Sequence, residues 1–297
     1  NNLAEKIYVA NRNDLDLTNQ QKTQEYLKNI NPDMIFIAAA KVGGILSNNS
    51  YPADFIYKNL MIECNLIHGA YLCNIKKILF LGSSCIYPKD MKNDTIVEED
   101  LLSGKLELTN EPYSIAKISG IKLCESYNRQ YNTDYRSIMP CNLYGPGDNY
   151  HLKNSHVIPA LISKIHNAKI NKLESLTLWG SGNPSREFLH VDDLASACIK
   201  IMQIKKIFYD KIVQDQASHI NVGSGLDISI KDLSKMICSI VGYKGKIEFD
   251  NKRLDGPLKK LLNIKKIISL GWVPDIDLKS GLKQVYLDFQ NNDQKFK

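Results

Sequence analysis

Short apolar runs alternate with longer segments of helical periodicity along the first three quarters of this chain. The run at residues 34–39 is continuously apolar, which is typical of a strand buried on both faces of a parallel sheet. The strands that we expect lie at residues 7–10, 34–39, 77–81, 135–139, 176–179, 188–191 and 219–222. The helices that we expect lie at residues 23–30, 54–73, 113–130 and 156–168, with a further helix capped by Asp192. This alternation predicts an α/β fold with a doubly wound parallel sheet.

The pattern becomes less regular after residue 150, where short helices are mixed with one or two strands. A chain of 297 residues is long enough for one large domain or for two unequal ones. We expect residues 1–150, with residues 188–223 returning to them, to form the larger domain. Residues 151–187 and 224–297 are then expected to form a smaller C-terminal α/β domain.

Three loops follow three of the predicted strands, at residues 40–44, 82–85 and 140–144. Ligands bind outside the carboxyl ends of the strands in doubly wound sheets, so we expect these loops to meet at one binding edge. Gly43 and Gly44 in the first loop allow a ligand to approach the backbone closely.

Tyr113 and Lys117 are four residues apart at the start of a predicted helix, where Pro112 suits the first turn. An ammonium beside a phenol favours the phenolate, so we expect Lys117 to lower the pKa of Tyr113 from about 10. Such a phenol is suited to protonating an alkoxide as a carbonyl is reduced, and Ser83 could donate a second hydrogen bond to the same oxygen. Tyr-x-x-x-Lys also arises by chance, so the surrounding loops have to support this interpretation. The sequence around Gly82 lacks Gly-x-Ser-x-Gly, which argues against a hydrolase.

Composition narrows the possible functions. The net charge of +6 is small and its lysines are dispersed, which favours a solvated surface over a nucleic-acid-binding one, although part of this charge could serve an anionic substrate. No apolar run reaches the roughly 18 residues of a membrane-spanning helix. The seven cysteines form no Cys-x-x-Cys pair and no metal-ligand cluster, so we expect reduced thiols, a cytoplasmic location and no bound metal.

Three runs resemble the extended short-chain dehydrogenase/reductase family: Gly-Ser-Ser-Cys-Ile-Tyr-Pro at 82–88, Asn-Glu-Pro-Tyr-x-x-x-Lys at 110–117 and Pro-Cys-Asn-Leu-Tyr-Gly-Pro at 140–146. The chain is similar to the GDP-L-fucose synthases in particular through Ala-Ala-Ala-Lys-Val-Gly-Gly-Ile at 38–45, Tyr-Pro-Ala-Asp-Phe-Ile at 51–56, Ser-His-Val-Ile-Pro-Ala at 155–160 and Arg-Glu-Phe-Leu-His-Val-Asp-Asp at 186–193. The resemblance implies a Rossmann-like NADP-binding domain and a smaller domain that binds a GDP-sugar substrate. The implied reaction is the NADPH-dependent 3,5-epimerisation and 4-reduction of GDP-4-keto-6-deoxy-D-mannose to GDP-L-fucose.

The resemblance also implies catalytic roles. Tyr113 would donate a proton to the C4 oxygen, Lys117 would tune it and bind the nicotinamide ribose, and Ser83 would polarise the carbonyl. Cys85 and His156 match the family's acid/base pair for epimerisation, and thiol and imidazole groups can titrate near neutral pH. A buried core thiol and a surface histidine are the alternatives for these two residues.

The implied binding residues lie in the first loop, at the strand ends and in the smaller domain. Arg12 falls where the family meets the adenosine 2′-phosphate, which favours NADP(H) over NAD. The other implied contacts with the cofactor are Asp16, Leu17, Leu81, Gly82, Ser84, Lys117, Pro140, Cys141, Asn142, Leu143 and His156. The implied GDP-sugar contacts are Lys164, Trp179, Arg186 and Lys246, since a diphosphate requires cationic donors and a base requires an aromatic or apolar wall.

One expected feature of the family is absent from this sequence. The fold should begin with a strand and a Gly-x-x-Gly-x-x-Gly turn that meets the pyrophosphate at a helix N-terminus. We expect the sequence to lack this first strand, turn and helix and therefore to bind NADPH weakly. Two alternatives stay open: another nucleotide-sugar epimerase or reductase of the family, and a nucleotide-sugar-binding module without turnover. By the same resemblance we expect a homodimer through the helices at 54–73 and 113–130, without nucleic-acid, membrane or metal partners.

Overall fold

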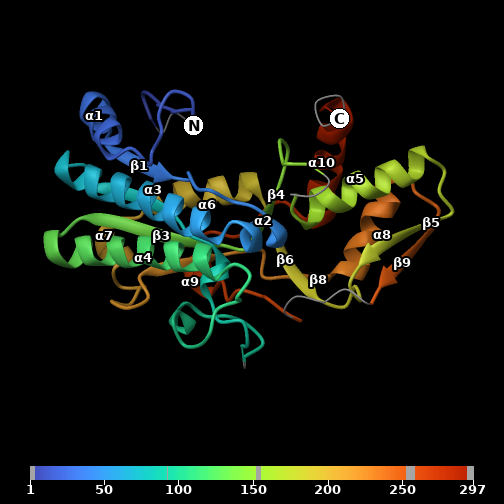
Figure 1. Cartoon of the computed structure of the whole chain (residues 1–297). Helices are drawn as coiled ribbons and strands as arrows, with labels where there is room; N and C mark the ends of the chain where they lie inside the picture. Colours follow the sequence, from blue (N-terminus) through green and yellow to red (C-terminus); the bar gives the residue numbers. More distant parts are fainter. Residues whose placement is uncertain (1–3, 92, 152–154, 252–257, 293–297) are drawn as a thin grey trace.

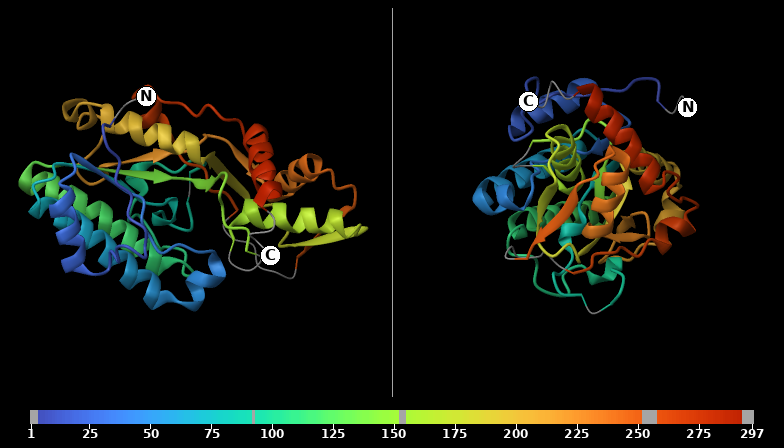
Figure 2. Two further views of the ribbon diagram at one scale, coloured as in Figure 1. Left: turned by 90° about the horizontal axis from the view of Figure 1, so that it is seen from above. Right: turned by 90° about the vertical axis from the view of Figure 1, so that its right-hand side faces the viewer.

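The computed structural model describes residues 4–91, 93–151, 155–251 and 258–292 (Figure 1). At its centre lies a sheet of four parallel strands in the order β1–β2–β3–β7. These strands are β1 (Met34–Ile37), β2 (Lys77–Leu81), β3 (Asp134–Pro140) and β7 (His219–Val222). Helices cover both faces of the sheet (Figure 2), so the predicted α/β fold with a doubly wound, Rossmann-like parallel sheet is confirmed.

Two long helices dominate one face of this sheet. α3 (Pro52–Leu72) and α4 (Glu111–Tyr131) lie side by side, and α1 (Gln20–Ile30) packs against α3. α6 (Val191–Gln203) covers the opposite face (Figure 2). The short elements of this part are α2 (Ile45–Ser50), α7 (Lys206–Tyr209), α9 (Lys265–Ser269) and the 3₁₀ turns η1 (Ser84–Ile86) and η2 (Glu98–Asp100). The main core fills the space between the sheet and its helices, where Ile78, Phe80 and Ile138 are fully buried.

Three predictions about element boundaries can be compared with the structure. α4 begins one residue before Pro112, as predicted, because a proline in the first turn lacks only an N–H that has no helical partner there. α6 begins after His190, whose ring accepts a hydrogen bond from the Asp192 amide, so the predicted cap at Asp192 is wrong. The predicted strand at residues 7–10 is also wrong, because these residues are exposed and pair with no described strand. An apolar run becomes a strand only where a neighbour satisfies its backbone hydrogen bonds.

A smaller body of helices and strands lies beyond the ends of the central strands (Figure 1). It contains α5 (Val157–Ile170), α8 (Ile230–Val241) and α10 (Leu278–Asn292), together with the parallel pair of β5 (Ser175–Trp179) and β9 (Lys246–Asp250). β6 (Ser185–His190) pairs in parallel with β4 (Asn142–Tyr144) and antiparallel with β8 (Asp227–Ser229). The core of this body includes Tyr144, Tyr150 and Phe188, which the predicted boundaries assign to the larger domain. The exact division of the chain into domains stays a prediction.

Among the described helices, none combines the length and the apolar character that crossing a bilayer requires. Within the described ranges, no group of three or more His, Cys, Asp or Glu side chains is arranged to hold a metal ion.

A buried polar network anchors the segment after β2 to the centre of the sheet. The Tyr87 hydroxyl donates to the Asn221 side chain, and it lies 3.0 Å from Nε2 of His219, which is therefore the donor in that second bond. The other ring nitrogen of His219 has no hydrogen-bond partner among the described residues. Burial lowers the pKa of His219 from 6.5 to about 3, because a proton on that nitrogen would place an unpaired charge inside the core.

This depressed pKa predicts a loss of stability in acid. An unfolded His219 binds a proton below pH 6.5 while the folded one does not, so the stabilisation is complete above pH 6.5 and falls as the pH approaches about 3. Between pH 7 and pH 5 we expect the free energy of unfolding of the wild type to fall by about 2 kcal/mol more than that of His219→Gln. Urea denaturation at the two pH values measures this difference. His151→Gln, at an exposed histidine, is the control, and equal slopes for wild type and His219→Gln would contradict the prediction.

Candidate functional site

The turn at the end of β2 brings Ser83 and Cys85 to the edge of the sheet. Gly82 leaves room there for the Met139 side chain of the neighbouring strand, which would have to move if residue 82 carried a Cβ. The Ser83 side chain then caps η1 by accepting a hydrogen bond of 3.3 Å from the Cys85 amide. The loop predicted to be functional is therefore a tight turn at the carboxyl end of a buried strand.

Residues at the start of α4 bind this turn by hydrogen bonds to Cys85. The Ser114 hydroxyl donates to the carbonyl oxygen of Cys85 at 2.9 Å, and Nδ2 of Asn110 lies 3.3 Å from Cys85 Sγ, to which it donates. Asn110 thus contacts the thiol and Ser114 holds the backbone of Cys85, and these two residues lie on either side of Tyr113 in the sequence. This arrangement places Ser83, Cys85 and Tyr113 in one cluster.

The phenol of Tyr113 occupies the centre of this cluster. Its ring meets Phe55 edge to face, with 6.4 Å between the ring centroids. Burial raises the pKa of Tyr113 well above its usual value, Cys85 and Glu63 raise it further, and a hydrogen bond from Ser83 lowers it. The expected lowering of this pKa by Lys117 is therefore wrong for this structure, because loss of water around the phenol is the largest effect and Lys117 is not among the groups that shift the pKa. Tyr113 consequently retains its proton at neutral pH.

Lys117 lies one helical turn after Tyr113, and among the described hydrogen bonds none joins its ammonium to the Tyr113 hydroxyl. Its ammonium donates to the carbonyl oxygen of Leu81 at 3.1 Å and sits 4.6 Å from the centroid of the Phe80 ring. The Tyr113 ring centroid is 5.9 Å away. The same ammonium lies 3.0 Å from Oε1 of Glu63, which sequence reasoning did not identify.

The loop after β1 closes a second side of the cluster. The buried Asn59 holds it by accepting from the Lys41 amide at 2.7 Å and by donating to the Lys41 carbonyl oxygen at 3.0 Å. A Cβ on Gly43 would lie 3.1 Å from Phe55, the residue that packs against Tyr113. Phe55 therefore lies between the loop after β1 and Tyr113, which is part of the cluster at the loop after β2.

His156 reaches the same region from the smaller body. It is the N-cap residue of α5, and its ring makes no capping hydrogen bond to that helix. The preceding residue, Ser155, lies against Gly44 of the loop after β1. Burial raises the pKa of Asp148, and His156 acts in the opposite direction, so the imidazole is near this carboxyl group.

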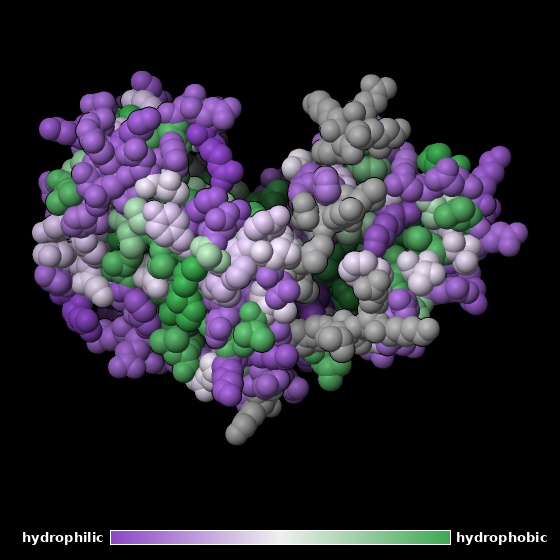
Figure 3. Space-filling model, in the orientation of Figure 1, coloured by the Kyte–Doolittle hydropathy of each residue, from purple (hydrophilic) through white to green (hydrophobic). Residues whose placement is uncertain are grey.

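Lys260 lies within electrostatic reach of residues from both bodies. Burial lowers the pKa of Lys260, Cys85 and Glu107 act to raise it, and Arg186 acts to lower it further. The ammonium is therefore within electrostatic reach of a predicted catalytic residue and a predicted substrate-binding residue. Figure 3 shows the surface hollowed between the two bodies.

The predicted cofactor residues lie mainly at the carboxyl ends of β2 and β3. The buried Pro140 ends β3, Cys141 donates its amide to the Val222 carbonyl oxygen, and Asn142 Nδ2 donates to the Glu187 carbonyl oxygen. The remaining predicted residues at these strand ends are Leu81, Gly82, Ser84 and Leu143. Lys117 Nζ also reaches this edge through its bond to Leu81. These residues form the kind of ledge on which doubly wound folds bind nucleotides.

The predicted adenosine residues lie in the loop before α1. Arg12 is exposed, and hydrogen bonds from Thr18 lower the pKa of Asp16, with a smaller contribution from the Arg12 guanidinium. Leu17 is half-buried and packs against the main core. An exposed guanidinium held near this loop suits an anionic group such as a phosphate.

The predicted substrate residues separate into two sets. Lys164 on α5 lies with its ammonium 5.2 Å from the ring centroid of Trp179, which ends β5 and is largely exposed. Arg186 is on β6, nearer the catalytic cluster. Lys246 is not brought to this region, because β9 pairs it with Ser175 while Trp179 pairs with Asp250, four residues or about 13 Å along the strand. Lys246 instead forms an exposed ion pair with Glu248 at 3.0 Å.

Sequence reasoning missed three residues of the cluster: Glu63, Asn110 and Lys260. Glu63 is a charged residue within an otherwise apolar helix face, and this is a signal that could have been noticed. Asn110 directly precedes the Glu-Pro-Tyr run, so its position beside the motif was visible. Lys260 is distant in sequence from every motif, and only the folded chain brings it near Cys85.

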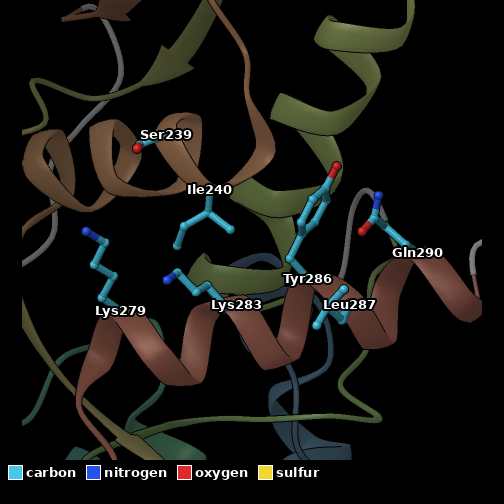
Figure 4. Close-up of a pocket in the computed structure, with 7 residues that line it drawn as sticks. All are labelled: Ser239, Ile240, Lys279, Lys283, Tyr286, Leu287 and Gln290. Carbon is cyan, nitrogen blue, oxygen red and sulfur yellow. The ribbon is translucent and has the colours of Figure 1, made fainter.

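A second hollow lies apart from this cluster. It is a groove of about 520 Å³ between α8 and α10, with Ser239 and Ile240 on one helix and Lys279, Lys283 and Tyr286 on the other (Figure 4). None of its lining residues belongs to the predicted site. The groove is open to solvent.

Comparison with known proteins agrees with the fold described above. The model of the NAD dependent epimerase/dehydratase family matches residues 1–223. The chain is 49% identical to the GDP-L-fucose synthase of Escherichia coli K12 over 292 residues, which cover 98% of this chain and 91% of that protein.

Solved structures of GDP-sugar enzymes are also similar. A GDP-mannoheptose C4 reductase from Campylobacter jejuni, solved with NADP bound, is 38% identical with a TM-score of 0.85, over 95% of this chain and 89% of that one. A GDP-6-OMe-4-keto-L-xylo-heptose reductase from the same organism is 36% identical with a TM-score of 0.88, over 96% of this chain and 90% of that one.

Proposed function

The chain belongs to the NAD dependent epimerase/dehydratase family, and from this premise we propose that it is a GDP-L-fucose synthase. It converts GDP-4-keto-6-deoxy-D-mannose to GDP-L-fucose by 3,5-epimerisation and 4-reduction, with NADP(H) as the cofactor. The observation that carries this proposal is the 49% identity over 98% of the chain, which includes both bodies and the whole cluster around Tyr113.

The residues present fit an NADP cofactor at the edge of the sheet. Leu81–Ser84 and Pro140–Leu143 form a ledge at the ends of β2 and β3, and the buried ammonium of Lys117 lies beside it. Arg12 is exposed near the loop where an adenosine phosphate would lie. When bound, NADPH supplies the hydride that reduces the C4 carbonyl.

Reduction requires a group that gives a proton to the C4 oxygen as negative charge develops there. Tyr113 retains its proton at neutral pH, so it can donate a hydrogen bond to the carbonyl oxygen and then transfer the proton to the alkoxide. Ser83, which hydrogen-bonds to Tyr113, can donate to the same oxygen. Two donors aimed at one oxygen stabilise the transition state more than the ground state.

Epimerisation requires the removal and return of protons at C3 and C5. The C4 ketone acidifies both positions, and the Tyr113 and Ser83 hydroxyls can stabilise the enolate. We assign the base and acid roles to Cys85 and His156, which enter from the larger and the smaller body. Asn110 Nδ2, 3.3 Å from the sulfur, can stabilise a thiolate at Cys85.

The GDP-sugar is proposed to lie between the two bodies. Lys164 and Trp179 offer a cation and an aromatic wall, and Arg186 lies nearer the catalytic cluster. Lys260 provides a further cation between Arg186 and Cys85. A role for Lys246 would require a ligand that extends along β9, so this residue is the weakest of the predicted substrate contacts.

We also propose a homodimer formed through α3 and α4 and a cytoplasmic location. Apolar side chains are exposed on both helices, including Tyr57 on α3 and Ile115 and Tyr131 on α4, and apolar atoms interrupt the hydrophilic surface over this area (Figure 3). Such a patch is typical of a surface that another protein covers. A monomeric mass in light scattering would count against the dimer.

The proposed function predicts the product of a defined reaction. GDP-4-keto-6-deoxy-D-mannose with NADPH should yield GDP-L-fucose, identified by nuclear magnetic resonance of the product sugar. The heptose reductases among the similar structures suggest the alternative, so GDP-4-keto-heptoses, UDP-keto sugars and dTDP-keto sugars are the comparison substrates. Faster turnover of one of these would contradict the assignment. Binding of the GDP-sugar without any turnover would favour the binding-module alternative.

Tyr113→Phe should lower the rate of reduction by about 10²–10⁴-fold, because it removes the proton donor while preserving the ring. The affinity for the GDP-sugar should change little, since the ring still packs against Phe55. NADPH absorbance follows the rate, and calorimetry follows the affinity. Tyr127→Phe, on the same helix but bonded to His68, is the control. A residual rate within tenfold of the wild type would refute the role of Tyr113.

Cys85→Ser should impair epimerisation more than reduction, because a serine hydroxyl is a far weaker acid than a thiol. The measurement is incorporation of solvent deuterium at C3 and C5, compared with hydride transfer to a substrate that is already epimerised. Cys64→Ser, at an exposed position on α3, controls for the loss of a thiol elsewhere. Equal losses in both steps would argue against the division of labour between Cys85 and Tyr113.

A further inference from the structure

Glu63 is a buried carboxyl group at the active site that the proposed reaction does not use. It lies on the face of α3 that packs against α4, and its side chain is 1% exposed. Its Oε1 is 3.0 Å from Nζ of Lys117, which is 2% exposed. Taking both charges out of water costs free energy, and removing either partner would leave the other charge buried without compensation.

The surroundings of this pair leave it little freedom. Among the described residues, neither oxygen of Glu63 accepts a hydrogen bond of good geometry, so the ion pair with Lys117 is the contact that compensates its burial. Lys117 is fixed on its other sides by the Leu81 carbonyl oxygen and the Phe80 ring. Gly120 makes the space, because a Cβ there would lie 2.9 Å from Oε2 of Glu63 and 2.4 Å from the Phe80 ring.

The charge of Glu63 reaches the catalytic phenol. Burial raises the pKa of Glu63 to about 7, and Lys117 acts in the opposite direction. The titratable groups that face this carboxyl are Lys117, Tyr113 and Cys124 on α4 and Cys64 on its own helix. After burial and Cys85, Glu63 is the next contributor to the raised pKa of Tyr113. A carboxylate beside Lys117 therefore opposes the usual effect of an active-site lysine on its tyrosine.

We propose that Glu63 is a positioning residue of this active site, which holds Lys117 at the end of β2 and offsets its positive charge so that Tyr113 keeps its proton. The proposal rests on the proposed function only in taking Tyr113 as the proton donor. It explains why a carboxylate is retained at a site where an apolar residue would avoid the burial of two charges.

The first experiment needs no substrate. Glu63→Gln preserves the shape of the side chain and removes its negative charge, so Lys117 should act on Tyr113 uncompensated. Ultraviolet difference titration of tyrosines should then show one phenol that ionises about 1–3 pH units lower than in the wild type. This shifted transition should be absent from Glu63→Gln/Tyr113→Phe. Glu187→Gln, at a buried carboxyl that accepts hydrogen bonds from the Gly225 and Leu262 amides, is the matched control and should show no such transition.

The second experiment uses the pH dependence of reduction. The alkaline limb of kcat/KM, where Tyr113 loses its proton, should move to lower pH in Glu63→Gln by the same amount. Glu63→Asp keeps the charge and should restore the wild-type profile even if kcat falls. A purely structural role would lower the stability of these variants and leave the profile unmoved.

An unpaired Lys117 could prevent Glu63→Gln from folding, and a further variant covers this case. Glu63→Gln/Lys117→Met removes both buried charges, and Tyr113 should titrate close to its wild-type position in it, while Lys117→Met alone should raise the titration of Tyr113. Identical titrations in the wild type, Lys117→Met and the double variant would overturn the proposal. If the variants show these titration differences from the wild type but the wild type turns over no GDP-keto sugar, the proposed function is refuted and the role of Glu63 stands.

Discussion

The ammonium of Lys117 is the charge on which this active-site region depends. It is buried where β2, α3 and α4 meet, and a buried charge is tolerated only where other groups compensate it. Three groups supply that compensation: the Glu63 carboxylate on α3, and the Leu81 carbonyl oxygen and the Phe80 ring on β2. The close approach of α3 to α4 that this requires is possible because residue 120 is a glycine. The packing of α3 against α4 therefore also determines the position of the Lys117 ammonium at the end of β2.

Loss of water, more than any single charge, determines the acidity of the groups around the cluster. The pKa of Tyr113 and that of Glu63 are both raised with burial as the largest cause, and burial lowers the pKa of Lys260. Burial by itself favours the neutral form of each group, and at Glu63 the ammonium of Lys117 acts against it and favours the carboxylate. A neutral phenol is the form required of a group that gives a proton to an oxyanion, which links the packing of the site to the reaction proposed for it.

The proposed site combines residues from two bodies with separate cores. The larger body supplies the strand ends and the residues Ser83, Cys85, Tyr113 and Lys117. The smaller body supplies His156 at the start of α5, and Lys260 lies within reach of both Cys85 and Arg186. This division suits the proposed epimerisation, because the two members of the proposed acid/base pair, Cys85 and His156, come from different bodies and can approach the sugar ring from different sides. It also explains why no single helix or loop contains the whole set of functional groups.

The order of strands and helices, the parallel sheet and the shared face of Tyr113 and Lys117 were predictable from the sequence, because they follow from spacing within short segments. The approach of the loops after β1 and β2 was also predictable, since the strands of a parallel sheet end at one edge. Other features were decided by contacts between segments far apart in the chain. Residues 7–10 have a strand-like pattern but no partner strand, and the register of β5 with β9 carries Lys246 away from Trp179. The pairing of Glu63 with Lys117, the approach of Lys260 to Cys85 and the raised pKa of Tyr113 depend on burial, which no local pattern specifies.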